Sequence, residues 1–134
     1  MKRLVLLGAG HAQLAVLDAF ARQRPAGAEV HLVTPQARTL YSGLVPACIA
    51  GRCREAELSI DAAPLAHAAG AALHLTRAKA IDAAAQTVAL ADGTTLRYDA
   101  LSINVGGAQD RDRIPGAREH ALFVRPIEGF LALW

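Results

Sequence analysis

The chain has 134 residues, of which 53% are of hydrophobic types, and this suits one domain with its own core. The formal net charge is +2 at pH 7, and basic and acidic residues are mixed along the chain, which argues against a nucleic-acid partner. No apolar run reaches the ~18 residues of a membrane span, and the N-terminal run is too short for a signal peptide. We therefore expect a cytoplasmic protein without a transmembrane segment.

The N-terminal residues predict a strand, a helix and a second strand. Residues 2–7 contain four apolar residues in a row, 4–7, and indicate a short buried strand that ends at Gly8. Apolar residues at helical spacing predict a helix over 11–24, which ends before Pro25. Residues 29–34 are rich in β-branched and apolar types and predict the second strand. This βαβ order implies a parallel pair with a right-handed crossover.

Two further helices are indicated before residue 70. The apolar segment TLYSGLVPACIAG predicts a short helix that ends at Gly51. Asp61 is a candidate N-cap for a helix that continues toward Gly70, with Pro64 in its first turn.

The chain after Gly70 changes to β structure. AALHLTRAKAID, QTVALADGTTLRYD and ALSINVGG predict successive strands, and Asp92-Gly93 is a hairpin turn signal. The last segment, FVRPIEGFLALW, predicts the start of a helix. A βαβ unit followed by a meander and an apolar strand ending in Gly-Gly is a specific order of elements.

The turn between the first strand and the first helix has the composition of a nucleotide-binding turn. Gly8 and Gly10 let the backbone turn tightly and approach a pyrophosphate, while the N-terminus of the helix favours an anion. Gln13 stands at the third glycine of the dinucleotide fingerprint, where glycine normally allows the helix to pack closely on the strand. The turn alone leaves plain strand-to-helix geometry as an equal alternative.

The end of the second strand lacks the acidic residue that usually binds the adenosine ribose. Thr34 occupies that position and carries a hydroxyl without charge. Arg38 follows a few residues later, and two interpretations stay open for it: a phosphate ligand or a solvated loop arginine.

Four stretches together resemble a known family. LVLLGAGHAQLAVL, VHLVTPQARTLYSGLVPACIAG, AKAIDAAAQTVALADGTTLRYDALSINVGG and IPGAREHALFVRPIEGF follow one another at its spacing. The sequence resembles the N-terminal part of the FAD-dependent pyridine nucleotide-disulfide oxidoreductases over nearly its whole length. Within them it is similar to the NADH-dehydrogenase-like branch and to the flavoprotein module that some bacteria fuse to selenide, water dikinase. The resemblance implies an α/β fold: a Rossmann-like FAD/NAD(P)-binding three-layer domain with a parallel sheet and a β-meander.

The resemblance also implies site residues, all for FAD. Different parts of the chain would contact the pyrophosphate, the adenosine and the flavin of FAD. The implied residues are Gly8, Gly10, His11 and Ala12 at the pyrophosphate, Thr34 and Pro35 at the ribose, Ala78 at the adenine, Ser42 and Gly43 toward the flavin, and Asn104, Val105 and Gly106 closing over the cofactor.

The cysteines and histidines allow other chemistry. Cys48 and Cys53 have the spacing of the redox disulfide of thiol-reducing relatives, but the flanking pattern is absent, so two ordinary cysteines are the favoured interpretation. Of the five histidines only His11, in the glycine turn, is a candidate ligand, and no pair has metal-binding spacing. We therefore expect no metal and identify no catalytic residue.

The expected function follows from the resemblance. The full-length protein would pass electrons from NAD(P)H, its co-substrate, through FAD to an acceptor, with the acceptor and the oligomeric state left open. Residues 1–134 would be a single FAD-binding domain, truncated from a longer chain whose nicotinamide-binding domain follows Trp134, and inactive alone. The alternative is a non-catalytic nucleotide-sensing or interaction module on the same fold, which would bind NAD or AMP-type ligands without flavin.

Overall fold

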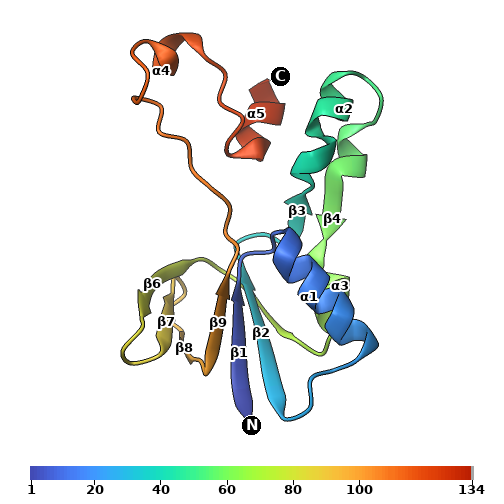
Figure 1. Ribbon diagram of the computed structural model, residues 1–134, viewed down its shortest axis with the longest axis vertical. Helices are drawn as coiled ribbons and strands as arrows, with labels where there is room; N and C mark the ends of the chain where they lie inside the picture. The colour runs from blue at the N-terminus through green and yellow to red at the C-terminus, as the bar shows by residue number, and fades with distance from the viewer. Residues whose placement is uncertain (134) are drawn as a thin grey trace.

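A parallel sheet of four strands forms the centre of the protein, whose computed structural model describes residues 1–133 (Figure 1). The strand order is β5-β2-β1-β9, so the chain moves outward from β1 on one side and returns to its other side. Leu7 pairs with both Val33 and Ile103, which brings the carboxyl ends of three strands to one edge. The strands are β1 (Lys2–Leu7), β2 (Ala28–Thr34), β5 (Ala72–Leu75) and β9 (Ala100–Ile103).

Two helices, α1 (His11–Arg22) and α3 (Ala62–Ala68), cover one face of the sheet (Figure 1). Leu14 and Leu17 of α1 pack with the sheet residues Leu6 and Leu32 and with the alanines of α3. Helix α1 ends two residues before the predicted end, because the backbone turns extended at Gln23.

The predicted N-cap of α3 is confirmed. The Asp61 carboxylate accepts a hydrogen bond from the backbone N–H of Ala63 at 3.0 Å and satisfies one of the free donors of the first turn.

A three-stranded antiparallel meander covers the other face of the sheet. Its strands are β6 (Ala78–Asp82), β7 (Thr87–Leu90) and β8 (Thr95–Arg97), in that order. Val88, Leu90 and Leu96 pack on the sheet residues Val5 and Leu7. The predicted hairpin turn joins β7 to β8, with Gly93 at a positive φ of 91° that only glycine adopts freely. The three predicted layers are therefore helices, parallel sheet and meander.

The stretch 71–82, predicted to be β structure, is divided between two sheets. Its first half is β5 in the parallel sheet and its second half is β6 in the meander, with Thr76 and Arg77 between them. The chain changes layer at these two residues, and the N–H of Ala91 donates to the carbonyl of Arg77 at 2.8 Å to hold the crossing. Periodicity cannot reveal such a break, because both halves are extended.

A second group of elements extends beyond the carboxyl edge of the sheet (Figure 1). The short antiparallel pair β3 (Arg38–Leu40) and β4 (Ser59–Asp61), which the sequence did not predict, leads to and from the predicted helix α2 (Val45–Ile49). The turns η1 (Ser42–Leu44) and η2 (Glu55–Leu58) flank α2.

The C-terminal segment returns to this second group. An extended run after β9 leads to α4 (Ala117–His120) and to the predicted helix α5 (Ile127–Leu133). Ile127 and Phe130 of α5 pack with Val45 of α2 and Leu58 of η2 in a small core. Among residues 1–133, no helix has the length and apolarity needed to cross a bilayer.

Candidate functional site

A cleft of about 590 Å³ lies at the carboxyl edge of the parallel sheet. It lies beyond the carboxyl ends of β1 and β9, next to the point at which the strand order reverses. This is the usual ligand position in open α/β sheets. Residues of the first loop, the β2 end, the β5–β6 crossing and the C-terminal segment all contribute to its wall.

The glycine turn is pressed against the end of β9. A Cβ at residue 8 would lie 2.3 Å from the carbonyl oxygen of Asn104, and Gly8 also has a positive φ of 85°. A Cβ at residue 10 would lie 1.5 Å from the side-chain Oδ1 of Asn104. Residue 8 therefore requires glycine, whereas a Cβ at residue 10 would first have to displace the Asn104 side chain. The turn is a close crossing of two backbone segments.

The N-terminus of α1 opens into this cleft. Gly10 is the N-cap and supplies no side-chain acceptor, and the first turn of α1 contains no acidic residue. The first N–H groups of the helix therefore keep their capacity to bind an anion, and the helix dipole favours one there.

The cleft carries positive charge. Arg38, Arg77 and Arg125 line it, and no aspartate or glutamate is among its described lining residues. Arg125 comes from the C-terminal segment, and its Nη1 lies 4.0 Å from where a Cβ would stand at Gly106. A negatively charged ligand therefore fits the electrostatics of this cleft.

Most of the predicted site residues meet in the cleft, although they come from widely separated parts of the chain. Ala12 and Gly43 do not line it: Ala12 is exposed, and Gly43 lies against the ring of Tyr41. The predicted residues that line the cleft are Gly8, Gly10, His11, Thr34, Pro35, Arg38, Ser42, Ala78, Asn104, Val105 and Gly106.

Thr34 lines the cleft, but it is buried and its hydroxyl is already hydrogen-bonded within the chain. Its side chain is only 4% exposed, and its hydroxyl donates to the backbone carbonyl of Gln36 at 3.0 Å. The hydroxyl hydrogen is therefore used within the turn that follows β2.

Sequence reasoning missed Arg77 and Arg125. Arg77 directly precedes the predicted Ala78, but the break between β5 and β6 that turns it toward the cleft has no local signal. Arg125 reaches the cleft only because α5 packs back against α2.

Cys48 and Cys53 do not line the cleft. Both are free and half-buried, and the Cys53 thiol lies 3.8 Å from the carbonyl oxygen of Leu44. Burial, followed by the neighbouring Cys48, raises the pKa of the Cys53 thiol above its usual 9.0, which is the opposite of what a redox thiolate needs. The interpretation as ordinary cysteines is favoured.

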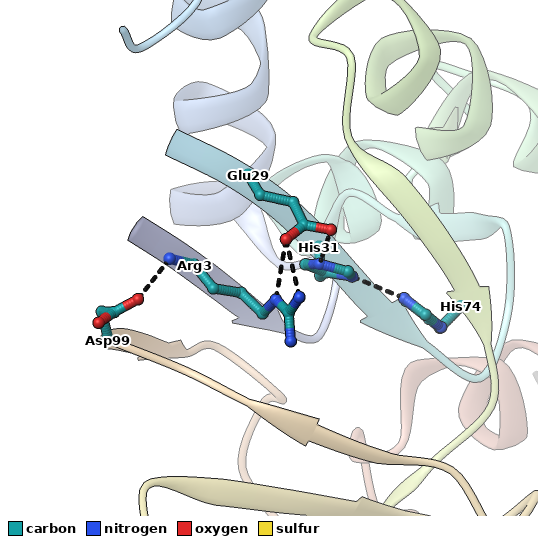
Figure 2. A network of polar contacts seen from close by, with 5 residues as sticks. All are labelled: Arg3, Glu29, His31, His74 and Asp99. Atoms are coloured by element: carbon teal, nitrogen blue, oxygen red, sulfur yellow. Dashed lines mark hydrogen bonds and ion pairs between the residues drawn. The ribbon is translucent and has the colours of Figure 1, made fainter. Parts of the chain in front are cut away.

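A polar network lies away from the cleft on the meander side of the sheet (Figure 2). Arg3 donates to Glu29 at 2.9 and 3.0 Å, and His31 Nδ1 lies 2.9 Å from His74 Nε2. The Nε2 of His31 is 3.0 Å from Glu29 Oε1, an ion-pair distance without the alignment of a hydrogen bond. The backbone N–H of Arg3 donates to Asp99 at 2.6 Å.

Burial dominates the electrostatics of this network. The His31 side chain is nearly enclosed, and burial lowers its pKa below 6.5 although Glu29 acts in the opposite direction. The hydrogen bond from Arg3 lowers the pKa of Glu29. A neutral His31 beside an ionised Glu29 follows at neutral pH. Within residues 1–133, no group of three or more side chains has the arrangement of a metal site.

Comparison with known proteins identifies the fold. No family model and no curated protein sequence matches the chain. Solved structures do match. The sulfide:quinone oxidoreductase of Aquifex aeolicus has a TM-score of 0.81 at 22% identity, covering 98% of this chain and 30% of that one. NDH2 of Plasmodium falciparum, solved in complex with NADH, has a TM-score of 0.76 at 17% identity, covering 98% and 28%.

A third structure, a NAD-dependent persulfide reductase from A. fulgidus, has a TM-score of 0.74 at 19% identity and covers 98% of this chain and 27% of that one. The chain therefore spans less than a third of the length of each of these three proteins. The expectation from sequence is confirmed for the fold: residues 1–133 have the Rossmann-like α/β fold of these three solved structures.

Proposed function

We propose that this chain is the FAD-binding part of a flavin-dependent NAD(P)H oxidoreductase. The observation that carries the proposal is the crossing of Gly8 and Gly10 with Asn104 beside an arginine-lined cleft whose described lining residues include no carboxylate. Two glycines packed closely against Asn104, next to a helix N-terminus, form a cradle for a pyrophosphate. The shared fold with oxidoreductases supports this assignment, and the NADH-dehydrogenase-like motifs of the sequence favour that branch.

The residues present fit a dinucleotide with a flavin. The N–H groups at the start of α1 would bind the pyrophosphate, and Arg125 and Gly106 would lie toward the flavin on the β9 side. The backbone of Ala78 would meet the adenine. When bound, FAD supplies the hydride and electron chemistry, whereas the chain binds and orients it. Transfer to an acceptor would need the nicotinamide-binding part of a longer chain.

A visible absorption spectrum tests the proposal. The purified chain is mixed with FAD, freed of excess by gel filtration and scanned for the flavin band near ~450 nm. We expect a retained band for the wild type and its loss in Gly8→Ala, whose Cβ would meet the Asn104 carbonyl. The control is Gly27→Ala, a glycine of similar positive φ with open space around it, outside the cleft.

The alternative, a nucleotide-sensing module, predicts a different result. Such a module would retain NAD or AMP without flavin. If neither the chain nor a longer version that includes the following domain retains FAD, the flavin assignment is wrong.

A further inference from the structure

The adenosine end of the cleft lacks the group that would recognise an unmodified ribose. In dinucleotide folds a carboxylate at the end of the second strand accepts hydrogen bonds from the ribose, whereas an arginine nearby accommodates a ribose phosphate. Here that position is Thr34, which is buried and donates its hydroxyl to Gln36. No carboxylate from any other described element lines the cleft.

Two arginines instead reach the cleft at this end. Thr34 pairs with Leu75 across β2 and β5, so Arg77 follows the end of β5 just as Gln36 follows the end of β2. Neighbouring strands are about 4.8 Å apart, so the segments that lead to Arg77 and to Arg38 leave the sheet from adjacent strand ends. Both side chains line the same cleft.

Both guanidinium groups are accessible to a ligand. Arg38 and Arg77 are exposed, and neither has an ion-pair partner within the described chain. Asp61 is the cross-strand partner of Arg38, but its carboxylate lies outside the cleft lining and caps α3 through Ala63. The carboxylate nearest in register is therefore already used by the fold.

We propose that Arg38 and Arg77 form a phosphate subsite at the adenosine end of the cleft, for an adenine nucleotide with a phosphomonoester on its ribose. Guanidinium groups bind phosphate oxygens through paired, charge-assisted hydrogen bonds, and two of them match the charge of one phosphomonoester. A nucleotide with a free ribose, FAD included, still fits the glycine turn, but it has no ribose phosphate for the two guanidinium groups to bind. A ribose-phosphorylated nucleotide therefore competes with FAD for the cleft. The proposal rests on the proposed function in that both place an adenine nucleotide there.

Calorimetric titration of the wild-type chain with three probes tests the subsite. The probes are 5′-AMP, adenosine 2′,5′-bisphosphate and adenosine 3′,5′-bisphosphate, which differ only in the ribose phosphate. We expect one bisphosphate to bind about tenfold more tightly than 5′-AMP, since even one charge-assisted contact supplies that factor. Which isomer binds more tightly identifies the phosphorylated hydroxyl.

Variants that each remove one positive charge test whether Arg38 and Arg77 cause the preference for a bisphosphate. In Arg38→Gln and Arg77→Gln the ratio of the bisphosphate affinity to the 5′-AMP affinity, measured in the same variant, should fall, and in the double variant it should approach one. Arg52→Gln removes an exposed arginine outside the cleft and should keep the full preference. Thermal melting of each variant checks that it is folded.

Three results would overturn the subsite. Equal affinity for all three probes would refute it while leaving the flavin proposal intact, and so would a preference that survives in the double variant. Failure of every probe to bind would also refute it. Retention of FAD, measured separately, decides the proposed function in each of these cases.

Discussion

The side-chain amide of Gln13 donates to the hydroxyl of Ser102 at an Nε2–Oγ distance of 3.1 Å, and so links α1 to β9. Gln13 is fully buried, and its Nε2 also lies 3.5 Å from the carbonyl oxygen of Leu7. A fingerprint glycine would let helix and strand touch at this point. In this protein a hydrogen bond from a buried side chain joins the helix to the sheet instead.

Truncation of this side chain should destabilise the fold. In Gln13→Ala the hydrogen bond to Ser102 is lost and a cavity remains, so we expect the free energy of unfolding to fall by about 1–3 kcal/mol. In Gln13→Met the volume is kept, and the side-chain Oε1, which has no hydrogen-bond partner in residues 1–133, is removed. That variant should therefore stay closer to the wild type. Urea unfolding measures both, and equal stability of the alanine variant and the wild type would show that the link contributes nothing.

The two glycines of the turn should differ in whether a second change can rescue them. In Gly10→Ala the new Cβ meets mainly the Asn104 side chain, at 1.5 Å from Oδ1 and 2.6 Å from Cγ. Shortening that side chain in Gly10→Ala/Asn104→Ala should recover part of the lost stability. In Gly8→Ala the Cβ meets the backbone carbonyl of Asn104 and the φ is positive, so Asn104→Ala should give no recovery.

Thermal unfolding of the two single and two double variants measures this difference. The Asn104→Ala single variant provides the reference for the cycle, because it reports the cost of losing the side chain alone. Equal recovery in both double variants would contradict the assignment of the clash at residue 10 to the Asn104 side chain.

Stability should fall as the medium becomes mildly acidic. Burial lowers the pKa of His31 below its unfolded value of 6.5, so below about pH 6.5 the unfolded chain binds more protons than the folded one. The stability that neutral His31 contributes is full above that pH and is lost as the pH falls toward the lowered pKa. The charged and titratable groups that act on His31 are Glu29, Arg3 and His74. His74 in turn interacts with Asp92 of the meander.

The melting temperature at pH 7.5 and at pH 5.5 measures this loss. His31→Gln carries no titrating group at that position, so we expect a smaller decrease between the two pH values than in the wild type. His67→Gln changes an exposed residue in the last turn of α3, outside the network, and should behave like the wild type. An equal decrease in wild type and His31→Gln would assign the acid sensitivity to other groups.

Local signals in the sequence determined the βαβ start, the Asp61 cap, the Asp92-Gly93 hairpin and the glycine turn. Each depends on residues only a few positions apart, so propensity and spacing suffice. Most of the site residues that the sequence indicated, through the order of these elements and their resemblance to a family, line the cleft.

Only the tertiary structure decided how distant residues meet. Gln13 and Ser102 are 89 positions apart, and His31 and His74 are 43 positions apart. Arg77 enters the cleft because β5 breaks where the chain changes layer, and Arg125 enters it because α5 packs on α2. Such contacts depend on strand register and on the packing of layers, which are set by burial over the whole domain rather than by neighbouring residues.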